Sequence, residues 1–279
     1  MVVELVAGRL LAPYVGVSLY TWTSVIGVVL AGISLGNFAG GLIADRYPSA
    51  RTLGILFGLS SLATLGVLAS TAVLGRLDLV PSGIGLQGRT VLVTATLFFL
   101  PSAMMGTITP VVVKLTLRDL ARTGHLVGRI YACGALGSIA GTFLTGFWLI
   151  SLFGTRKIVL GVALVLLLLA LATGDIIRRR RVLPRIELVG AALLVLGFAA
   201  SWRWLVDHGR LIAPCTLETN YYCIRVDEQK QGDGRLVRRL VLDHLIHSYA
   251  DINDPTYLQY GYESIFADIT AYTALKKGA

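Results

Sequence analysis

Charged residues are scarce in this sequence. Asp, Glu, Lys and Arg together make up 15% of the 279 residues, whereas 55% are hydrophobic and the mean hydropathy is +0.72. This composition excludes a water-soluble globular protein and predicts an integral membrane protein with a short polar tail. No basic segment precedes the first apolar run and no small-residue cleavage site follows it, so we expect no cleavable signal peptide.

Cysteine is also rare, with three in the chain. Cys133, Cys215 and Cys223 define neither a metal site nor a disulfide framework by their spacing. Cys215 and Cys223 would pair if the tail faced an oxidising compartment, but we expect two free thiols. His244 and His247 lie three residues apart on a predicted strand, point to opposite faces and lack further ligands, so we expect no metal there.

The net charge of +9 does not indicate a nucleic-acid partner. The arginines cluster in a few segments between apolar runs instead of forming one basic face, which is the pattern of membrane topology. The lipid bilayer is therefore the expected partner.

Apolar runs long enough to cross a membrane are abundant. The first run, residues 1–14, reaches only about 20 Å and cannot span a hydrocarbon core of about 30 Å. Six longer runs follow, namely Leu19–Ala44, Thr52–Leu74, Thr90–Leu117, Val127–Phe153, Ile158–Ile177 and residues 188–206. The sequence therefore predicts an α-helical membrane bundle of six to seven transmembrane helices over residues 1–206.

Two features within these runs predict how the helices are shaped. Pro101 and Pro110 remove backbone donors and should kink the run Thr90–Leu117. Glycines four residues apart, at Gly32, Gly36 and Gly40 and again at Gly137 and Gly141, leave ridges without side chains, which we expect to serve helix packing.

The connections between runs differ in basic charge. One side holds eleven Lys or Arg (Arg46, Arg51, Lys114, Arg118, Arg122, Arg129, Arg178–Arg181 and Arg185), and the other holds seven (Arg9, Arg76, Arg89, Arg156, Lys157, Arg203 and Arg210). Because basic loops stay on the cytoplasmic side, a multi-pass protein of the inner (plasma) membrane with an extracytoplasmic tail is expected. The last run has only thirteen uninterrupted apolar residues (188–200), so an interfacial orientation stays open.

Residues 207–279 form a second predicted domain, rich in β structure. Residues 220–226 and 235–242 should pair as a hairpin around a turn at 227–234, and residues 245–249 form a third strand. Asp254 and Pro255 have the features of an N-cap and first helical position, and predict a helix from Thr256 toward Lys276.

Several of these segments resemble one family. Residues 218–226, 239–243 and 251–263 resemble the N-terminal β-domain of spermidine synthases and other aminopropyltransferases of polyamine biosynthesis. Residues 4–13 and 41–46 resemble the membrane half of bacterial proteins that fuse a major-facilitator-like bundle to such a domain.

The resemblance implies transfer of an aminopropyl group from decarboxylated S-adenosylmethionine to putrescine. In the family, the nucleotide-binding Gly-rich loop and the catalytic aspartate lie in a Rossmann-like domain after the β-domain. This sequence stops at Ala279, where that domain should begin. We therefore expect an incomplete, inactive portion with no cofactor site of its own.

The residues on the substrate side by this resemblance are Tyr221, Asp243, His247 and Tyr260. Three neighbours depart from the family pattern, since Tyr222 replaces a glutamine, His244 a glycine, and Gly261 a glutamine or histidine. His247 itself stands where the family has glutamine. These departures predict a different amine or none.

Polar residues in the membrane half carry further hypotheses. Glu4 and Arg9 lie in a helix that should meet lipid, so they either face the bundle interior in a structural or transport role, or Glu4 lies among the headgroups. Asp45 and Arg46 resemble the loop of major-facilitator transporters that clamps cytoplasmic helix ends. In a half-length bundle we expect them to act as scaffolding.

Two other functions stay open. The bundle could be a transporter or carrier for a polyamine or small metabolite with the tail as a receptor module, or the protein could be a scaffold; a homo-oligomer is compatible with each. Only Glu4 and Asp175 are acidic residues near the spans, which gives cation transport little support. Gly83–Gly88 matches GxGxxG, but lacks the strand that a nucleotide site requires and is predicted to be a loop.

Overall fold

The computed structural model describes residues 1–74, 84–117, 123–173, 185–232, 234–254 and 256–277. Predictions that rest on Gly83, Asp175, Arg178–Arg181 and Pro255 fall outside these ranges. The chain divides into two compact units, Met1–Ala213 and Pro214–Ala279.

The first unit is helical. Its helices are α1 (Val2–Val15), α2 (Leu19–Arg46), α3 (Ala50–Leu74), α4 (Leu86–Gly106), α5 (Ile108–Thr116), α6 (Thr123–Leu144), the π-helical turn η3 (Thr145–Leu149), α7 (Ile150–Phe153), α8 (Thr155–Thr173) and α9 (Arg185–Asp207). Within the described residues, six stretches are long and apolar enough to cross a membrane. They coincide with the six long runs, so the prediction of a multi-span membrane bundle is confirmed at this level.

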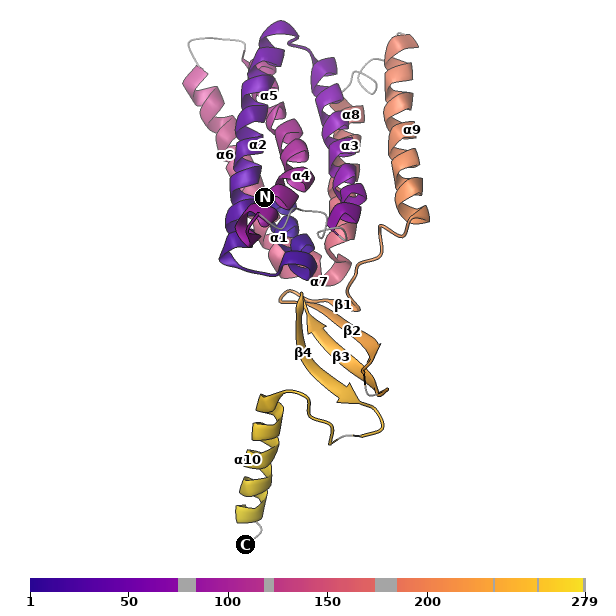
Figure 1. Ribbon diagram of the computed structural model, residues 1–279. Coiled ribbons are helices and arrows are strands. Elements are labelled where there is room, and N and C mark those ends of the chain that lie inside the picture. Colours follow the sequence, from indigo (N-terminus) through magenta and orange to yellow (C-terminus); the bar gives the residue numbers. More distant parts are fainter. Residues whose placement is uncertain (75–83, 118–122, 174–184, 233, 255, 278–279) are drawn as a thin grey trace. The chain divides into compact units, whose positions relative to one another are not determined.

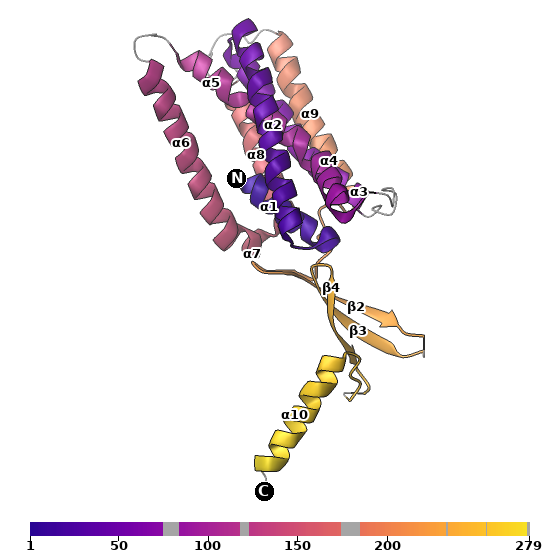
Figure 2. The same ribbon diagram turned by 60° about the vertical axis from the view of Figure 1, so that its left-hand side comes forward.

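The long helices alternate in direction (Figures 1 and 2). The α2–α3 turn, α5 and the start of α6 lie at one end of the bundle, and α7, the start of α4 and the end of α9 lie at the other. Since α9 is the sixth long stretch, the chain leaves the bundle at the end opposite the Asp45–Arg51 turn. The helix α1 has 14 residues and is not among the six, as its length predicted.

Glycine allows α2 and α4 to approach closely. A Cβ on Gly36 would lie 2.1 Å from the Ala103 carbonyl oxygen, and one on Gly40 would lie 2.5 Å from that of Thr107. Both glycines are buried, which confirms the packing role of this ridge. On α6 the two glycines differ, because a Cβ on Gly137 would meet nothing within 4 Å, whereas one on Gly141 would lie 3.0 Å from the Val2 side chain of α1.

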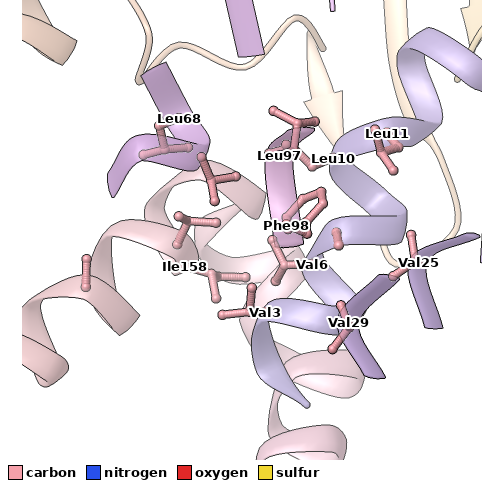
Figure 3. Close-up of a cluster of buried hydrophobic side chains, with 14 of the residues drawn as sticks. Val3, Val6, Leu10, Leu11, Val25, Val29, Leu68, Leu97, Phe98 and Ile158 are labelled. Carbon is pink, nitrogen blue, oxygen red and sulfur yellow. The ribbon is translucent and has the colours of Figure 1, made fainter. Parts of the chain in front are cut away.

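The apolar core of the bundle lies where α1, α2, α3, α4 and α8 meet (Figure 3). Phe98 of α4 is fully buried there, beside Val6 of α1 and in the same cluster as Leu68 of α3. Burial of apolar surface against neighbouring helices leaves few voids and holds their relative positions.

Two local breaks interrupt the long helices. The run Thr90–Leu117 is interrupted at Thr107, between α4 and α5 and three residues before Pro110, which agrees with the kink predicted at that proline, whereas Pro101 lies inside α4. The Thr107 hydroxyl and the Thr107 amide both donate to the Met104 carbonyl, at 2.7 Å and 3.3 Å respectively. The second break is the π-helical turn at Thr145–Leu149, which no residue pattern predicted.

The second unit contains a four-stranded antiparallel sheet in the order β1 (Leu217–Glu218), β2 (Cys223–Lys230), β3 (Leu236–Leu242) and β4 (Leu245–Asp251). The predicted hairpin corresponds to β2 and β3, whose register pairs Asp227 with Arg239. The short strand β1 was not predicted.

The final helix, α10 (Gly261–Lys277), begins five residues later than expected. The Asp254 carboxylate does accept from the Thr256 amide at 3.1 Å, but the chain does not turn helical there. Instead the Tyr260 amide donates to the Glu263 carboxylate at 3.2 Å, which caps α10 from its first turn. The prediction that the helix begins after Asp254 is therefore wrong.

The expectation of free thiols in the tail is wrong for this structure. Cys215, two residues before β1, and Cys223, the first residue of β2, form a disulfide with their Cα atoms 5.3 Å apart. The β1–β2 turn brings the two cysteines within bonding range, and this turn was not visible in the sequence pattern. Cys133 is a free, exposed thiol on α6.

Candidate functional site

Asp243 closes one end of the sheet. Its φ of 57° is left-handed, a conformation that Asp tolerates better than most residues. The Asp243 amide donates to the Cys223 carbonyl at 2.8 Å, and the Cys223 amide donates to the Asp243 carboxylate at 2.9 Å. Because this carboxylate is buried and engaged with the backbone, it stabilises the corner.

Tyr260 lies where the chain leaves the sheet for α10. Its hydroxyl donates to the Ile246 carbonyl at 3.0 Å, and its ring centroid lies 5.6 Å from Tyr249 and 5.5 Å from Tyr262. Desolvation, with smaller contributions from neighbouring tyrosines, raises the pKa of Tyr260 above its usual value of 10.0. The phenol therefore stays protonated and remains a donor at neutral pH.

His247 is the extra residue of a β-bulge in β4, since Ile246 pairs with Val241 and Ser248 with Leu240. Its backbone carbonyl accepts from the Tyr262 hydroxyl, whereas its side chain is exposed. Tyr221 lies in the β1–β2 turn and is 79% exposed.

The structure thus brings Asp243, His247 and Tyr260 to the end of the sheet where β3 turns into β4. Tyr221 belongs to the neighbouring turn, two residues from Cys223. The polar side-chain atoms of Asp243 and Tyr260 form hydrogen bonds with backbone groups. The ring faces of the tyrosines are therefore the groups at this end of the sheet that could contact a ligand.

The sequence interpretation missed a row of charged and aromatic side chains across the sheet. Asp227, Arg239 and Tyr249 occupy directly opposed positions on β2, β3 and β4. Arg239 donates from both Nε and Nη2 to the two carboxylate oxygens of Asp227, each at 2.8 Å. These hydrogen bonds hold the pKa of Asp227 below its usual value of 3.8, so the pair is ionised and self-neutralising.

A cavity of about 850 Å³ lies inside the bundle. Its wall comes from α1, α2, α4, α5, η3, α7 and α8 and is mostly apolar. Glu4 and Lys157 contribute the charged side chains of this wall, and Ser102 and Thr109 contribute hydroxyls. Within the described part of the chain, neither Glu4 nor Lys157 forms an ion pair. An elongated ligand with an amine or carboxylate end matches this lining.

Arg9, five residues after Glu4 in α1, is not among the residues that line the cavity. At the opposite end of the bundle, Lys114 of α5 contacts the Asp45 carboxylate at 2.8 Å, which links the ends of α2 and α5. Arg46 instead contacts its neighbour Tyr47, with Nε donating to the phenol oxygen at 3.2 Å.

In the ranges that the structure covers, no group of three or more His, Cys, Asp or Glu side chains could hold a metal ion. Comparison with family models, with curated proteins and with solved structures gives no match.

Proposed function

We propose that this chain is the membrane bundle and amine-binding β-domain of a spermidine synthase-like protein. In that role the tail would present putrescine or a related polyamine for aminopropyl transfer. The nucleotide site for decarboxylated S-adenosylmethionine and the catalytic aspartate would have to come from outside residues 1–279, so this portion alone is inactive.

One observation carries the proposal. A helical membrane bundle precedes an antiparallel sheet, and Tyr260 stands at the junction between that sheet and a helix, with Tyr249 and Tyr262 beside it. Tyrosine ring faces attract ammonium groups by about 0.5–1 kcal/mol at exposed sites. A diamine that contacts such rings gains modest affinity without a buried carboxylate.

The test is amine binding by the purified chain in detergent, measured by isothermal titration with putrescine. Tyr262→Ala should weaken binding several-fold, whereas Tyr272→Ala should not, because Tyr272 is exposed on the same helix and outside the cluster. Equal affinity of both variants would refute amine binding at the cluster. A stop codon directly after Ala279 in the intact genome would remove the transferase role and leave binding untouched.

The cavity supports a second candidate, a carrier for an amine or small metabolite. Glu4 is the acid in its wall, and a carboxylate in an apolar cavity strongly favours a cationic ligand. In proteoliposomes, Glu4→Gln should abolish accumulation of radiolabelled putrescine while leaving thermal unfolding unchanged. Unchanged uptake by the variant would eliminate the carrier function.

Two signals support an extracytoplasmic tail within this proposal. The sequence has eleven basic residues on one side of the membrane against seven on the other, and the tail carries the Cys215–Cys223 disulfide. Structural disulfides persist mainly in oxidising compartments. After mild reduction of intact cells with an impermeant phosphine, an impermeant maleimide should label the tail; labelling only after lysis would reverse the assignment.

A further inference from the structure

The two faces of the tail sheet differ in what covers them. On one face, Val237 and Val241 are 0% and 2% exposed. The segment after β4 folds back over this face, because the Tyr257 hydroxyl donates to Gln231 and the Tyr260 ring lies against Tyr249. This face already has its cover within the chain.

The other face presents apolar side chains in one row. The register aligns Leu217, Ile224, Leu242 and Leu245 directly across all four strands, so their side chains share a face. Leu217 is 57% exposed and Leu245 is 56% exposed. The four residues lie at the end of the sheet that holds the β1–β2 and β3–β4 turns. We call them the apolar row.

Polarity increases along the same face away from this end. The next row contains Val226 and Leu240, and the row after it is charged, with Arg238 donating to Glu228 at 3.0 Å. At the turn end, Tyr221 and Tyr222 are exposed, 79% and 48% respectively. Tyrosine is enriched at membrane–water interfaces because its ring is apolar and its hydroxyl is polar.

The apolar row begins close to the membrane helix in the chain, because Leu217 lies ten residues after Asp207, the last residue of α9. Arg156 is buried in the bundle and donates to the Arg210 carbonyl at 2.6 Å, which holds the chain at the end of α9. From Arg210 to Cys215 the chain spans at most about 18 Å, at about 3.6 Å per residue. The disulfide then joins Cys215 to Cys223, the residue just before the apolar row.

We propose that the apolar row, together with Tyr221 and Tyr222, rests on the phospholipid surface of the membrane. The leucine and isoleucine side chains enter the boundary between headgroups and acyl chains, and the tyrosines stay at headgroup level. Such interfacial elements bury their apolar face about 5–10 Å deep. The charged end of the sheet and the Tyr249–Tyr260–Tyr262 cluster then face water. This surface is independent of the amine-binding proposal.

The experiment uses the full chain reconstituted in liposomes, in a Cys133→Ala background that leaves no free thiol in the described residues. An environment-sensitive maleimide dye is attached at Leu245→Cys. The matched control is Leu236→Cys, because Leu236 is 49% exposed on the same face at the far end of the sheet. Both sites are exposed, so the label should not disturb folding.

The Leu245 dye should shift its emission to the blue. Lipids with a doxyl group near the headgroup should quench it more strongly than lipids with the group at the chain terminus. The Leu236 dye should show neither effect. Equal quenching at both positions would overturn the proposal. A Leu245 dye that is shielded from iodide but unaffected by either doxyl lipid would also overturn it, since the row would then be covered by protein.

Discussion

Gly36→Ala should separate α2 from α4. The added methyl carbon would lie 2.1 Å from the Ala103 carbonyl oxygen, which is 1.3 Å inside the 3.4 Å at which ordinary contact begins. The same carbon would lie 2.9 Å from the Ala103 carbonyl carbon and 3.0 Å from the Gly106 Cα. All three neighbours are backbone atoms, so no side-chain rotation relieves the clash and the helices themselves must move.

Overpacking of this kind costs about 1–3 kcal/mol. Replacing glycine by alanine inside a helix gains up to about 1 kcal/mol of helix propensity, which would mask part of the loss. The matched control removes this gain from the comparison. Gly27 lies in the same helix, and a Cβ there would meet nothing within 4 Å. The free energies of unfolding of Gly36→Ala and Gly27→Ala should therefore differ by the packing cost, about 1–3 kcal/mol.

The assay is SDS-induced unfolding in mixed micelles, followed by tryptophan fluorescence. Equal unfolding midpoints for the two variants would refute the close approach of α2 and α4. The double variant Gly36→Ala/Ala103→Gly provides a second check. Since the clash involves the backbone of residue 103, removing its methyl group should restore nothing, and a full rescue would contradict the geometry.

Three further predictions concern polar contacts. Asp243→Ala should lower the free energy of unfolding of the tail by about 1–3 kcal/mol, measured by thermal melting, because a buried amide loses its acceptor; Asp243→Asn should retain most of the stability. The tail should lose stability as pH falls below 3.8, the usual pKa of Asp, toward the lower pKa of Asp227, because only the ionised carboxylate binds Arg239. An acid titration followed by circular dichroism should show this loss in the unmodified chain and not in Asp227→Asn. A double-mutant cycle on Asp45 and Lys114 should give a coupling of only about 0.2–1 kcal/mol, because both side chains are exposed, and a coupling well above this range would contradict the observed exposure.

The membrane half could be predicted because a membrane span is a local property. Twenty consecutive apolar residues satisfy the length of the hydrocarbon core whatever they pack against, so the long runs corresponded directly to helices. The π-helical turn at Thr145–Leu149 could not be predicted in this way, because it leaves no mark in the apolar pattern. The break at Thr107, in contrast, lies three residues before Pro110 and agrees with the kink predicted there.

The structure of the tail was harder to predict, because it depends on pairing between strands. The β2–β3 hairpin was visible in residue composition, but β1 is two residues long and exists only through its pairing with Ile224 and Cys223. The disulfide follows from that pairing, so the thiol prediction was wrong for the same reason. Likewise, the bulge at His247 reverses the side on which the following residues of β4 point, and a period-2 pattern that assumes an unbroken strand cannot place them.

The site residues divide along the same line. A family resemblance assigned Asp243 and Tyr260 to the substrate side, yet both side chains bond to backbone groups that only the folded register brings near them. Conversely, Arg239 has its partner Asp227 twelve residues away, and the pair becomes visible only once the register is known. In this sheet the strand register decides which side chains bond to the backbone and which stay available for a ligand. Residue type alone does not reveal this difference.

An extracytoplasmic tail constrains the chemistry that the proposal allows. If the proposed relation to spermidine synthases holds, the nucleotide donor is cytosolic, so a tail outside the membrane would meet amines without it. The departures from that proposed pattern at Tyr222, His244 and Gly261 would also remove side chains on the substrate side. Both points favour binding over transfer for an extracytoplasmic tail. A cytoplasmic tail would instead require the Cys215–Cys223 disulfide to persist against cellular reductants. The side of the membrane therefore decides between the two halves of the proposal.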